Sequence, residues 1–245
     1  VVAATIPVAR DASGLTIDAT GVWVTAWYDN ELWRNDPATS TVAAKVPVVV
    51  PGHGGPESIA SGLGSLWVAT TEWDASDTAL PGYVLRVDPA TGKVTATIPV
   101  GRDPGAVAVG AGAVWVANFD DGTLARIDPT ANTLAATIQV PGIFDVAAGD
   151  TIWASKKDGT LARIDPKTNA IAQSVTTDAK DPEIALGGGA VWVTSDATAT
   201  SASARLLRVV PPDPAQPHAA VARQLFDLAK PQTLSAYGEW TKKSG

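Results

Sequence analysis

A tryptophan flanked by aliphatic residues recurs at regular intervals along this chain of 245 residues. Five strong copies and a weaker sixth are present: Val22-Trp23-Val24, Leu66-Trp67-Val68, Val114-Trp115-Val116, Ile152-Trp153-Ala154, Val191-Trp192-Val193 and Glu239-Trp240-Thr241. Successive tryptophans lie 44, 48, 38, 39 and 48 residues apart. A period of about forty residues that contains only strand-like segments is typical of a β-propeller, in which each repeat forms one blade.

The clearest repeat runs from Asp103 to Val140 and contains four short β-rich segments, at 106–109, 114–117, 124–128 and 134–138. Each is bounded by turn residues, so we expect four antiparallel strands, named a to d from the central channel outward. The turn between a and b carries glycine in every repeat, and the turn between c and d reads Asp-Pro in four repeats, with a threonine nearby. Asp at the first position and Pro at the second favour a type I turn, so we interpret these aspartates as structural.

Strand a shows a large aliphatic residue followed by a small one, as in Val107-Ala108 and Ile59-Ala60. This alternation suits the tapering space around a central channel. The recurring tryptophan of strand b is interpreted as packing between blades, since an indole buries roughly 150–250 Å².

The repeats predict one domain over residues 1–245, an all-β propeller with six blades of four antiparallel strands. Five blades are expected at about 12–50, 56–100, 104–140, 143–177 and 182–228. The sixth is split between 231–245 and 1–8, because Val2 to Val8 matches the d-strand pattern of Val94 to Val100. No strand c follows Lys243. Either roughly ten residues are absent from the chain, going by strand lengths, or the sixth blade is irregular; a seventh would need much more sequence.

Composition narrows the classes of partner and compartment. The net charge is −7 and Lys and Arg are scattered, which disfavours nucleic acid and anionic membranes as partners. There is no cysteine, no methionine and no run of about 18 apolar residues, so no disulfide framework and no transmembrane segment are expected. We expect a monomeric, extracytoplasmic protein, secreted, periplasmic or at the cell surface, whose signal peptide has been removed.

The repeat also carries a family resemblance. The segments 112–118, 121–129 and 135–138, which read GAVWVAN, DGTLARIDP and AATI, resemble the repeat of YVTN/YncE-type propellers and of the related virginiamycin B lyase-like (streptogramin lyase-like) propellers. The resemblance covers about residues 1–210. It implies the propeller fold and bacterial or archaeal surface proteins that are often non-catalytic, and it includes a metal-dependent lyase that uses histidines and a glutamate. This chain departs from the lyase pattern, because it has only His53 and His218 and no Glu-x-His pair.

Loop lengths indicate which rim of the propeller binds a ligand. The a–b and c–d turns on one rim are short, whereas the d–a and b–c connections on the other vary, and variable loops on a rigid scaffold commonly carry binding residues. Trp27 and Trp73 lie there, outside the repeating tryptophan positions; each either binds a ligand or covers its own loop. The predicted ligand-binding residues are Arg10, Trp27, Tyr28, His53, Glu57, Glu72, Trp73, Arg102, Phe119, Phe144 and Lys180.

Basic residues just before strand a form a second pattern on this rim, at Arg10, His53, Arg102, Lys180 and Lys230. In a closed ring they would surround one mouth of the channel and favour an anion or carboxylate. The alternative is that Asp11, Asp103 and Asp181, which directly follow three of them, neutralise them in solvated loops.

Three functions remain open. The leading hypothesis is an exported, non-catalytic binding or scaffold protein, without catalytic residues, metal or cofactor, that takes a small molecule or a protein or polysaccharide partner on the d–a/b–c rim. The second is a lyase-like or hydrolase-like enzyme with His53 and Glu57 near the channel mouth. The third is a structural module of a larger surface protein.

Overall fold

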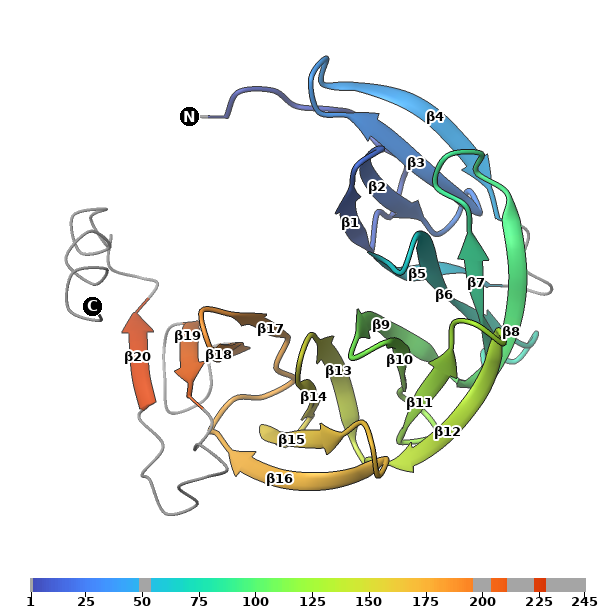
Figure 1. The fold of residues 1–245 in the computed structure, drawn as a ribbon. Coiled ribbons are helices and arrows are strands. Elements are labelled where there is room, and N and C mark those ends of the chain that lie inside the picture. Colours follow the sequence, from blue (N-terminus) through green and yellow to red (C-terminus); the bar gives the residue numbers. More distant parts are fainter. Residues whose placement is uncertain (1, 49–53, 196–203, 211–222, 228–245) are drawn as a thin grey trace.

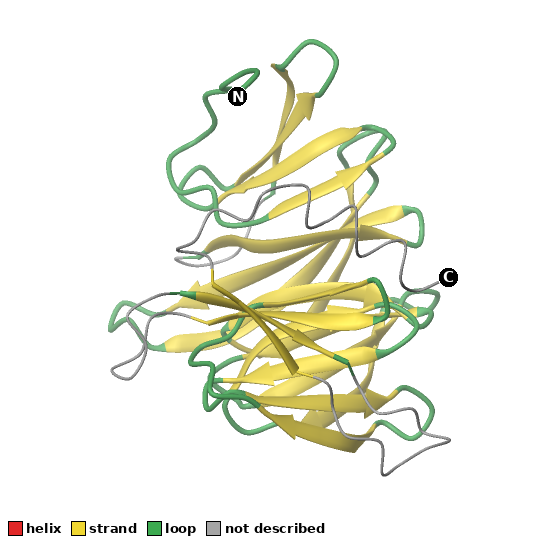
Figure 2. Ribbon diagram, turned by 90° about the vertical axis from the view of Figure 1, so that its left-hand side faces the viewer, coloured by secondary structure: helices red, strands yellow, loops and turns green. Residues whose placement is uncertain are grey.

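The computed structural model describes residues 2–48, 54–195, 204–210 and 223–227, and all regular structure in them is β-strand (Figure 2). Twenty strands form five sheets of four antiparallel strands, each in chain order. The sheets stand around a common centre as the blades of a propeller (Figure 1). The all-β propeller and the four-stranded blade are therefore confirmed.

Each blade is one sheet, with its innermost strand first. Blade 1 holds β1 (Leu15–Asp18), β2 (Gly21–Ala26), β3 (Glu31–Asp36) and β4 (Thr41–Pro47). Blade 2 holds β5 (Gly55–Gly62), β6 (Ser65–Trp73), β7 (Ala79–Val87) and β8 (Val94–Arg102). Blade 3 holds β9 (Pro104–Gly110), β10 (Ala113–Asn118), β11 (Thr123–Asp128) and β12 (Thr133–Gln139). Blade 4 holds β13 (Ile143–Ala148), β14 (Ile152–Lys156), β15 (Thr160–Asp165) and β16 (Ala170–Thr176). Blade 5 holds β17 (Ile184–Gly187), β18 (Ala190–Ser195), β19 (Arg205–Val209) and β20 (Arg223–Asp227).

The prediction of six blades is wrong, because the described strands build five. Residues 2–8, expected to close a sixth blade as its outer strand, form no strand and are mostly exposed, Val2 to 81%. A strand pattern needs a neighbouring backbone to pair its N–H and C=O groups, and no described strand pairs with this segment. The other half of the predicted sixth blade, 231–245, lies outside the described residues.

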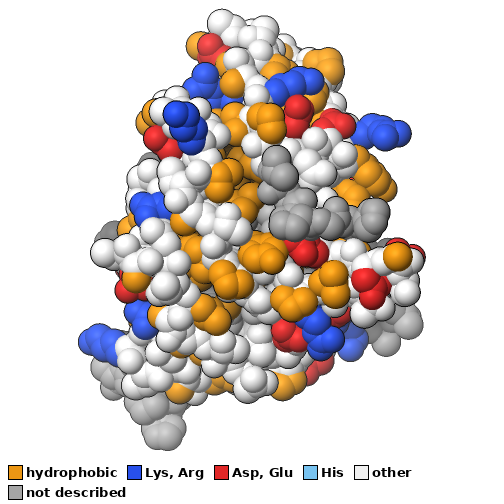
Figure 3. Space-filling view, turned by 90° about the vertical axis from the view of Figure 1, so that its right-hand side faces the viewer, with side chains coloured by type: hydrophobic (Ala, Val, Ile, Leu, Met, Phe, Trp, Pro, Cys, Tyr) orange, Lys and Arg blue, Asp and Glu red, His pale blue; other side chains and the backbone are white. Residues whose placement is uncertain are grey.

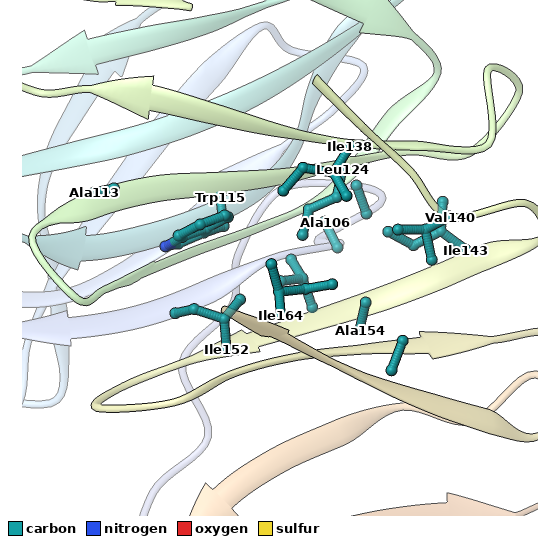
Figure 4. Packing of buried hydrophobic residues seen from close by; sticks show 13 residues of the cluster. Ala106, Ala113, Trp115, Leu124, Ile138, Val140, Ile143, Ile152, Ala154 and Ile164 are labelled. Atoms are coloured by element: carbon teal, nitrogen blue, oxygen red, sulfur yellow. The ribbon is translucent and has the colours of Figure 1, made fainter. Parts of the chain in front are cut away.

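The recurring tryptophans pack between neighbouring blades, as predicted. Trp23, Trp67, Trp115 and Trp153 are at most 1% exposed. Trp115, from β10, lies in one cluster with Val146 and Ile152 of blade 4, and Figure 4 shows its indole in the layer above Ile152 and Ile164. Burying one indole at each junction gives the successive blades a repeated hydrophobic contact.

Within the described residues, each of the two ends of the five-blade arc lacks one such junction. Leu15 of β1 is 63% exposed, whereas the equivalent Ile59 and Val107 are 5% and 8% exposed, because each of those packs against the preceding blade. At the other end Trp192 is only partly buried. Figure 1 shows the opening between the β1–β4 sheet and the β17–β20 sheet.

Arginines of the third strand stand opposite the tryptophans and reach across the junctions. Arg86 pairs in register with Trp67, and its guanidinium lies 5.1 Å from the centre of the indole ring. The same group donates hydrogen bonds to Pro129 O at 2.8 Å and Asn132 Oδ1 at 3.0 Å, in the c–d turn of the next blade. Arg126 contacts Asn169 in the same way at 3.3 Å.

The c–d turns have the predicted chemistry. The carboxylates of Asp36, Asp88, Asp128 and Asp165 each accept the backbone N–H two residues later, at 2.7 to 2.8 Å. These aspartates are therefore structural.

On the outer side that carries β8, charged side chains of both signs are scattered among hydrophobic ones (Figure 3). No helix in the described part of the chain is suited to cross a membrane.

Candidate functional site

A repeated backbone hydrogen bond brings two kinds of loop together on one rim of the propeller. The N–H of the residue four after the tryptophan donates to the carbonyl of the loop that precedes strand a: Trp27 to Asp11 at 3.2 Å, Phe119 to Asp103 at 2.8 Å and Lys157 to Gly142 at 2.8 Å. Asp11, Asp103 and Gly142 all have a left-handed φ, of 60°, 52° and 76°. The loop after strand b is thus held beside the loop before strand a.

A pocket of about 430 Å³ opens on this rim across blades 1, 2 and 3. We call it the rim pocket. Its lining residues fall largely on equivalent positions of the repeat. Asp11 and Asp103 share one position, Ser13, Glu57 and Gly105 share a second, and Trp27, Thr71 and Phe119 each lie four residues after the recurring tryptophan. Tyr28 and Trp73 complete the lining. Its volume falls in the range of small-molecule sites.

Hydrogen bonds and ring contacts fix the aromatic part of the pocket. The indole N–H of Trp27 donates to Thr71 Oγ1, in blade 2, at 3.1 Å. Tyr28 lies edge-on to Trp27, with ring centres 4.9 Å apart, and Phe119 stacks on Phe144 of blade 4 at 5.9 Å. Tyr28 is 60% exposed. The rings are therefore held in place while parts of them remain open to solvent.

Two glycines allow these rings to lie against backbone. A Cβ atom at Gly55 would approach Trp27 Cγ to 2.9 Å, and one at Gly105 would approach Phe119 Cε2 to 2.0 Å. Any larger residue at either position would require the ring or its backbone to move.

Three of the lining residues, Asp11, Glu57 and Asp103, carry carboxylates. Burial, together with the neighbouring carboxylates of Asp103 and Asp11, raises the pKa of Glu57. Burial and Asp120 raise the pKa of Asp103, with Lys157 opposing them. Among the described residues, no ion pair joins any of the three to a cation. The pocket is therefore acidic, and the carboxylates disfavour one another's ionised forms.

Five of the predicted site residues are brought together in the rim pocket: Trp27, Tyr28, Glu57, Trp73 and Phe119. Two more predicted residues contact this lining without being part of it. Phe144 stacks on Phe119, and the Arg10 guanidinium lies 5.5 Å from the centre of the Tyr28 ring.

The remaining predicted residues do not line it. Glu72 is buried in β6, where burial raises its pKa. Arg102 is paired with Asp121 at 2.8 Å, and Lys180 is exposed in the loop before β17. His53 lies outside the described residues. No Lys or Arg lines the pocket, so the predicted anion site finds no support there.

The predicted site residues did not include five that line the pocket: Asp11, Ser13, Thr71, Asp103 and Gly105. In the sequence Asp11 and Asp103 stand out only as possible partners of the basic residues that precede them, which is one of two alternatives for those loops. The available signal was the repeat register, because each missed residue occupies the same position in its blade as another residue of the pocket.

The side chains that line the pocket present carboxylates, hydroxyl groups and aromatic rings. No group of three or more His, Cys, Asp or Glu side chains within the described ranges is placed to hold a metal ion. The arrangement can accept hydrogen bonds, attract positive charge and stack on a flat or methylated group.

Comparisons with known proteins address the fold. A scan against protein-family models finds no match, and no curated protein matches the sequence. Solved structures do match. Hydrazine synthase from Kuenenia stuttgartiensis superposes with a TM-score of 0.67 at 16% identity, over 90% of this chain and 68% of that one. BamB from Moraxella catarrhalis superposes with a TM-score of 0.57 at 13% identity, over 75% of this chain and 55% of that one. Both are β-propellers, and at these identities they support the fold alone.

Proposed function

We propose that this protein is a non-catalytic binding protein that takes its ligand in the rim pocket. The observation that carries the proposal is the convergence of four aromatic rings and three carboxylates from three consecutive blades on one concave site. A rigid scaffold with aromatic walls and a few polar groups is the usual composition of a ligand site. The held ring geometry, with Trp27 bonded to Thr71, lowers the ordering cost of binding.

A lyase-like or hydrolase-like enzyme is the second candidate. One observation favours it: burial and neighbouring carboxylates raise the pKa of Glu57 within the pocket. A carboxyl group with a raised pKa beside ionised ones is a common general acid. The binding role is preferred because the sequence offers only two histidines and no cysteine to serve as nucleophile or base beside it.

We further propose that this chain is a YVTN/YncE-type repeat protein and that it acts outside the cytoplasm. The repeated GAVWV and ARIDP segments support the family, and the sparse Lys and Glu with no cysteine support the compartment. The ligand would be a small molecule, or a group displayed by a protein or polysaccharide.

A screen with variants tests the binding role. Calorimetric titration would measure the binding of cationic, neutral and anionic small molecules, oligosaccharides and peptides. The proteins compared would be the parent, Trp73→Ala and Trp33→Ala. Trp33 is the matched control, because it lies in β3 outside the pocket, where its indole bonds Glu31. We expect binding that is lost in Trp73→Ala and kept in Trp33→Ala, with the ligand recovered unchanged. Chemical conversion of a bound compound, abolished by Glu57→Gln, would establish the enzyme instead. Absence of any binder, or binding indifferent to Trp73, would overturn the proposal.

A further inference from the structure

The charge of the rim pocket limits what can enter it. Among the described residues, its ionisable lining groups are Asp11, Glu57, Asp103 and the phenol of Tyr28, and none of these is basic. An anion would meet three carboxylates at close range, which disfavours it; a cation would be attracted by all three.

Three cations in the described part of the chain contact this rim, and none of them lines the pocket. Arg102 pairs with Asp121 at 2.8 Å through its side chain. Lys157 lowers the pKa of Asp103 without forming an ion pair within 4.0 Å. Arg10 lies over Tyr28. Burial and the carboxylates of Asp103 and Asp11 raise the pKa of Glu57, and no cation of the described residues opposes them.

The aromatic lining fits the same kind of ligand. Aromatic rings attract cations through their electron-rich faces, most strongly when water is partly excluded. This protein already uses that contact at the pocket's edge, where the Arg10 guanidinium lies 5.5 Å from the centre of the Tyr28 ring. Trp27, Trp73 and Phe119 are partly buried, so a group between them would be partly desolvated.

We propose that the rim pocket recognises an organic cation, an ammonium or guanidinium group held between the aromatic rings and bonded or attracted to Glu57, Asp103 and Asp11. This inference rests on the proposed binding function and names the chemistry of its ligand. The pocket, of about 430 Å³, accommodates a small free amine or one Lys or Arg side chain of a basic partner. Both sources present the same cationic group.

The test separates charge from shape. Choline would be compared with its uncharged isostere dimethylbutanol, and butylguanidinium with butylurea, by titration of the full chain at low and high salt. A Lys/Arg-rich peptide and the same peptide with Glu at those positions form the second arm. The variants are Glu57→Gln, Trp73→Ala and Asp128→Asn. Asp128→Asn removes one negative charge in the c–d turn on the opposite rim, where asparagine can still accept the N–H of Thr130.

We expect a cation to bind about tenfold more tightly than its neutral isostere, with the advantage shrinking in high salt. Glu57→Gln should weaken the cation about fivefold and leave the isostere unchanged, whereas Asp128→Asn should stay within about twofold of the parent. A preference for the free cations over the peptide assigns a small-molecule ligand, and the reverse assigns a basic partner.

Equal binding of cation and isostere, sensitive to Trp73→Ala, would overturn the cation inference while leaving the binding function intact. A preference for anions or neutral sugars would do the same. If no cationic probe binds, or if binding ignores both Glu57 and Trp73, the inference is wrong; if the broader screen also finds no Trp73-dependent ligand, the binding function fails with it.

Discussion

The ring of Phe119 lies so close to Gly105 that a Cβ atom there would come within 2.0 Å of ring carbon Cε2. Phe119 in turn stacks on Phe144, with ring planes only 7° apart. One glycine at the start of β9 therefore sets the position of an aromatic wall that spans blades 3 and 4.

Gly105→Ala should push the Phe119 ring away from β9 and break its stack on Phe144. Because the obstructing atoms belong to a side chain that can swing aside, we expect a loss of about 1–3 kcal/mol in the free energy of unfolding, together with weaker ligand binding. Urea unfolding and the aromatic proton shifts of both rings measure this. Gly149→Ala is the control, since its Cβ would lie 3.5 Å from Leu186, an ordinary contact. Unchanged Phe119 shifts in Gly105→Ala would contradict the prediction.

The fold could be predicted from the tryptophan spacing because each indole reports one local event, the packing of one blade on the next. Closure of the ring could not be predicted in this way, because it depends on pairing between the two ends of the chain. Val2 to Val8 has a convincing strand pattern and yet forms no strand. A pattern of side chains specifies which face of a strand is buried, and it does not supply the partner backbone.

Part of the pocket lining could be predicted where a tryptophan lies outside the repeating tryptophan positions, as Trp27 and Trp73 do. The charged part of the lining could not be predicted, because the sequence does not show which acidic residue pairs with which basic one. Arg102 neighbours Asp103 in sequence, yet it pairs with Asp121, nineteen positions later. Asp103 is left to line the pocket. Ion pairing depends on which loops the blade brings together, so neighbourhood in the sequence did not identify the partner of Arg102.

Equivalent aliphatic residues should differ sharply in their contribution to stability. Ile59→Ala removes a side chain buried between blades 1 and 2, so we expect a cost of about 2–5 kcal/mol. Leu15→Ala alters the same position of blade 1, where the residue is 63% exposed, and should change stability by less than about 0.5 kcal/mol. Chemical denaturation of both variants checks the pair. A Leu15→Ala cost comparable with that of Ile59→Ala would mean that this face of blade 1 is covered in solution.

Asp145 should make stability fall as pH rises. It accepts the N–H groups of Val146 at 2.7 Å and Ile184 at 2.8 Å, but burial dominates and raises its pKa to about 6 from an unfolded value near 3.8, with Glu183 adding to the rise. The folded state therefore binds more protons between these two values. The stabilisation is complete below about pH 3.8 and is lost as pH rises through about 6.

The variant Asp145→Asn isolates this effect, because asparagine does not titrate. We expect the stability of the parent relative to the variant to decline by roughly 2 kcal/mol between pH 4 and pH 7. Urea unfolding at intervals across that range measures it, and the other carboxylates titrate in both proteins. A constant difference between parent and variant would show that Asp145 has an ordinary pKa.

Arg86 should contribute more to the free energy of unfolding than a surface arginine does, because it contacts two blades. Its guanidinium contacts the Trp67 ring, and its nitrogens bond Ser65 Oγ at 2.8 Å in its own blade and Pro129 O and Asn132 Oδ1 in the next. Lysine keeps the charge but cannot hold three separate acceptors with a planar fork. We therefore expect Arg86→Lys to lower the free energy of unfolding by about 1–2 kcal/mol, measured by thermal and urea unfolding. Arg102→Lys is the control, since its exposed pair with Asp121 should contribute little. Equal effects of the two substitutions would show that the contact between blades 2 and 3 does not depend on this arginine.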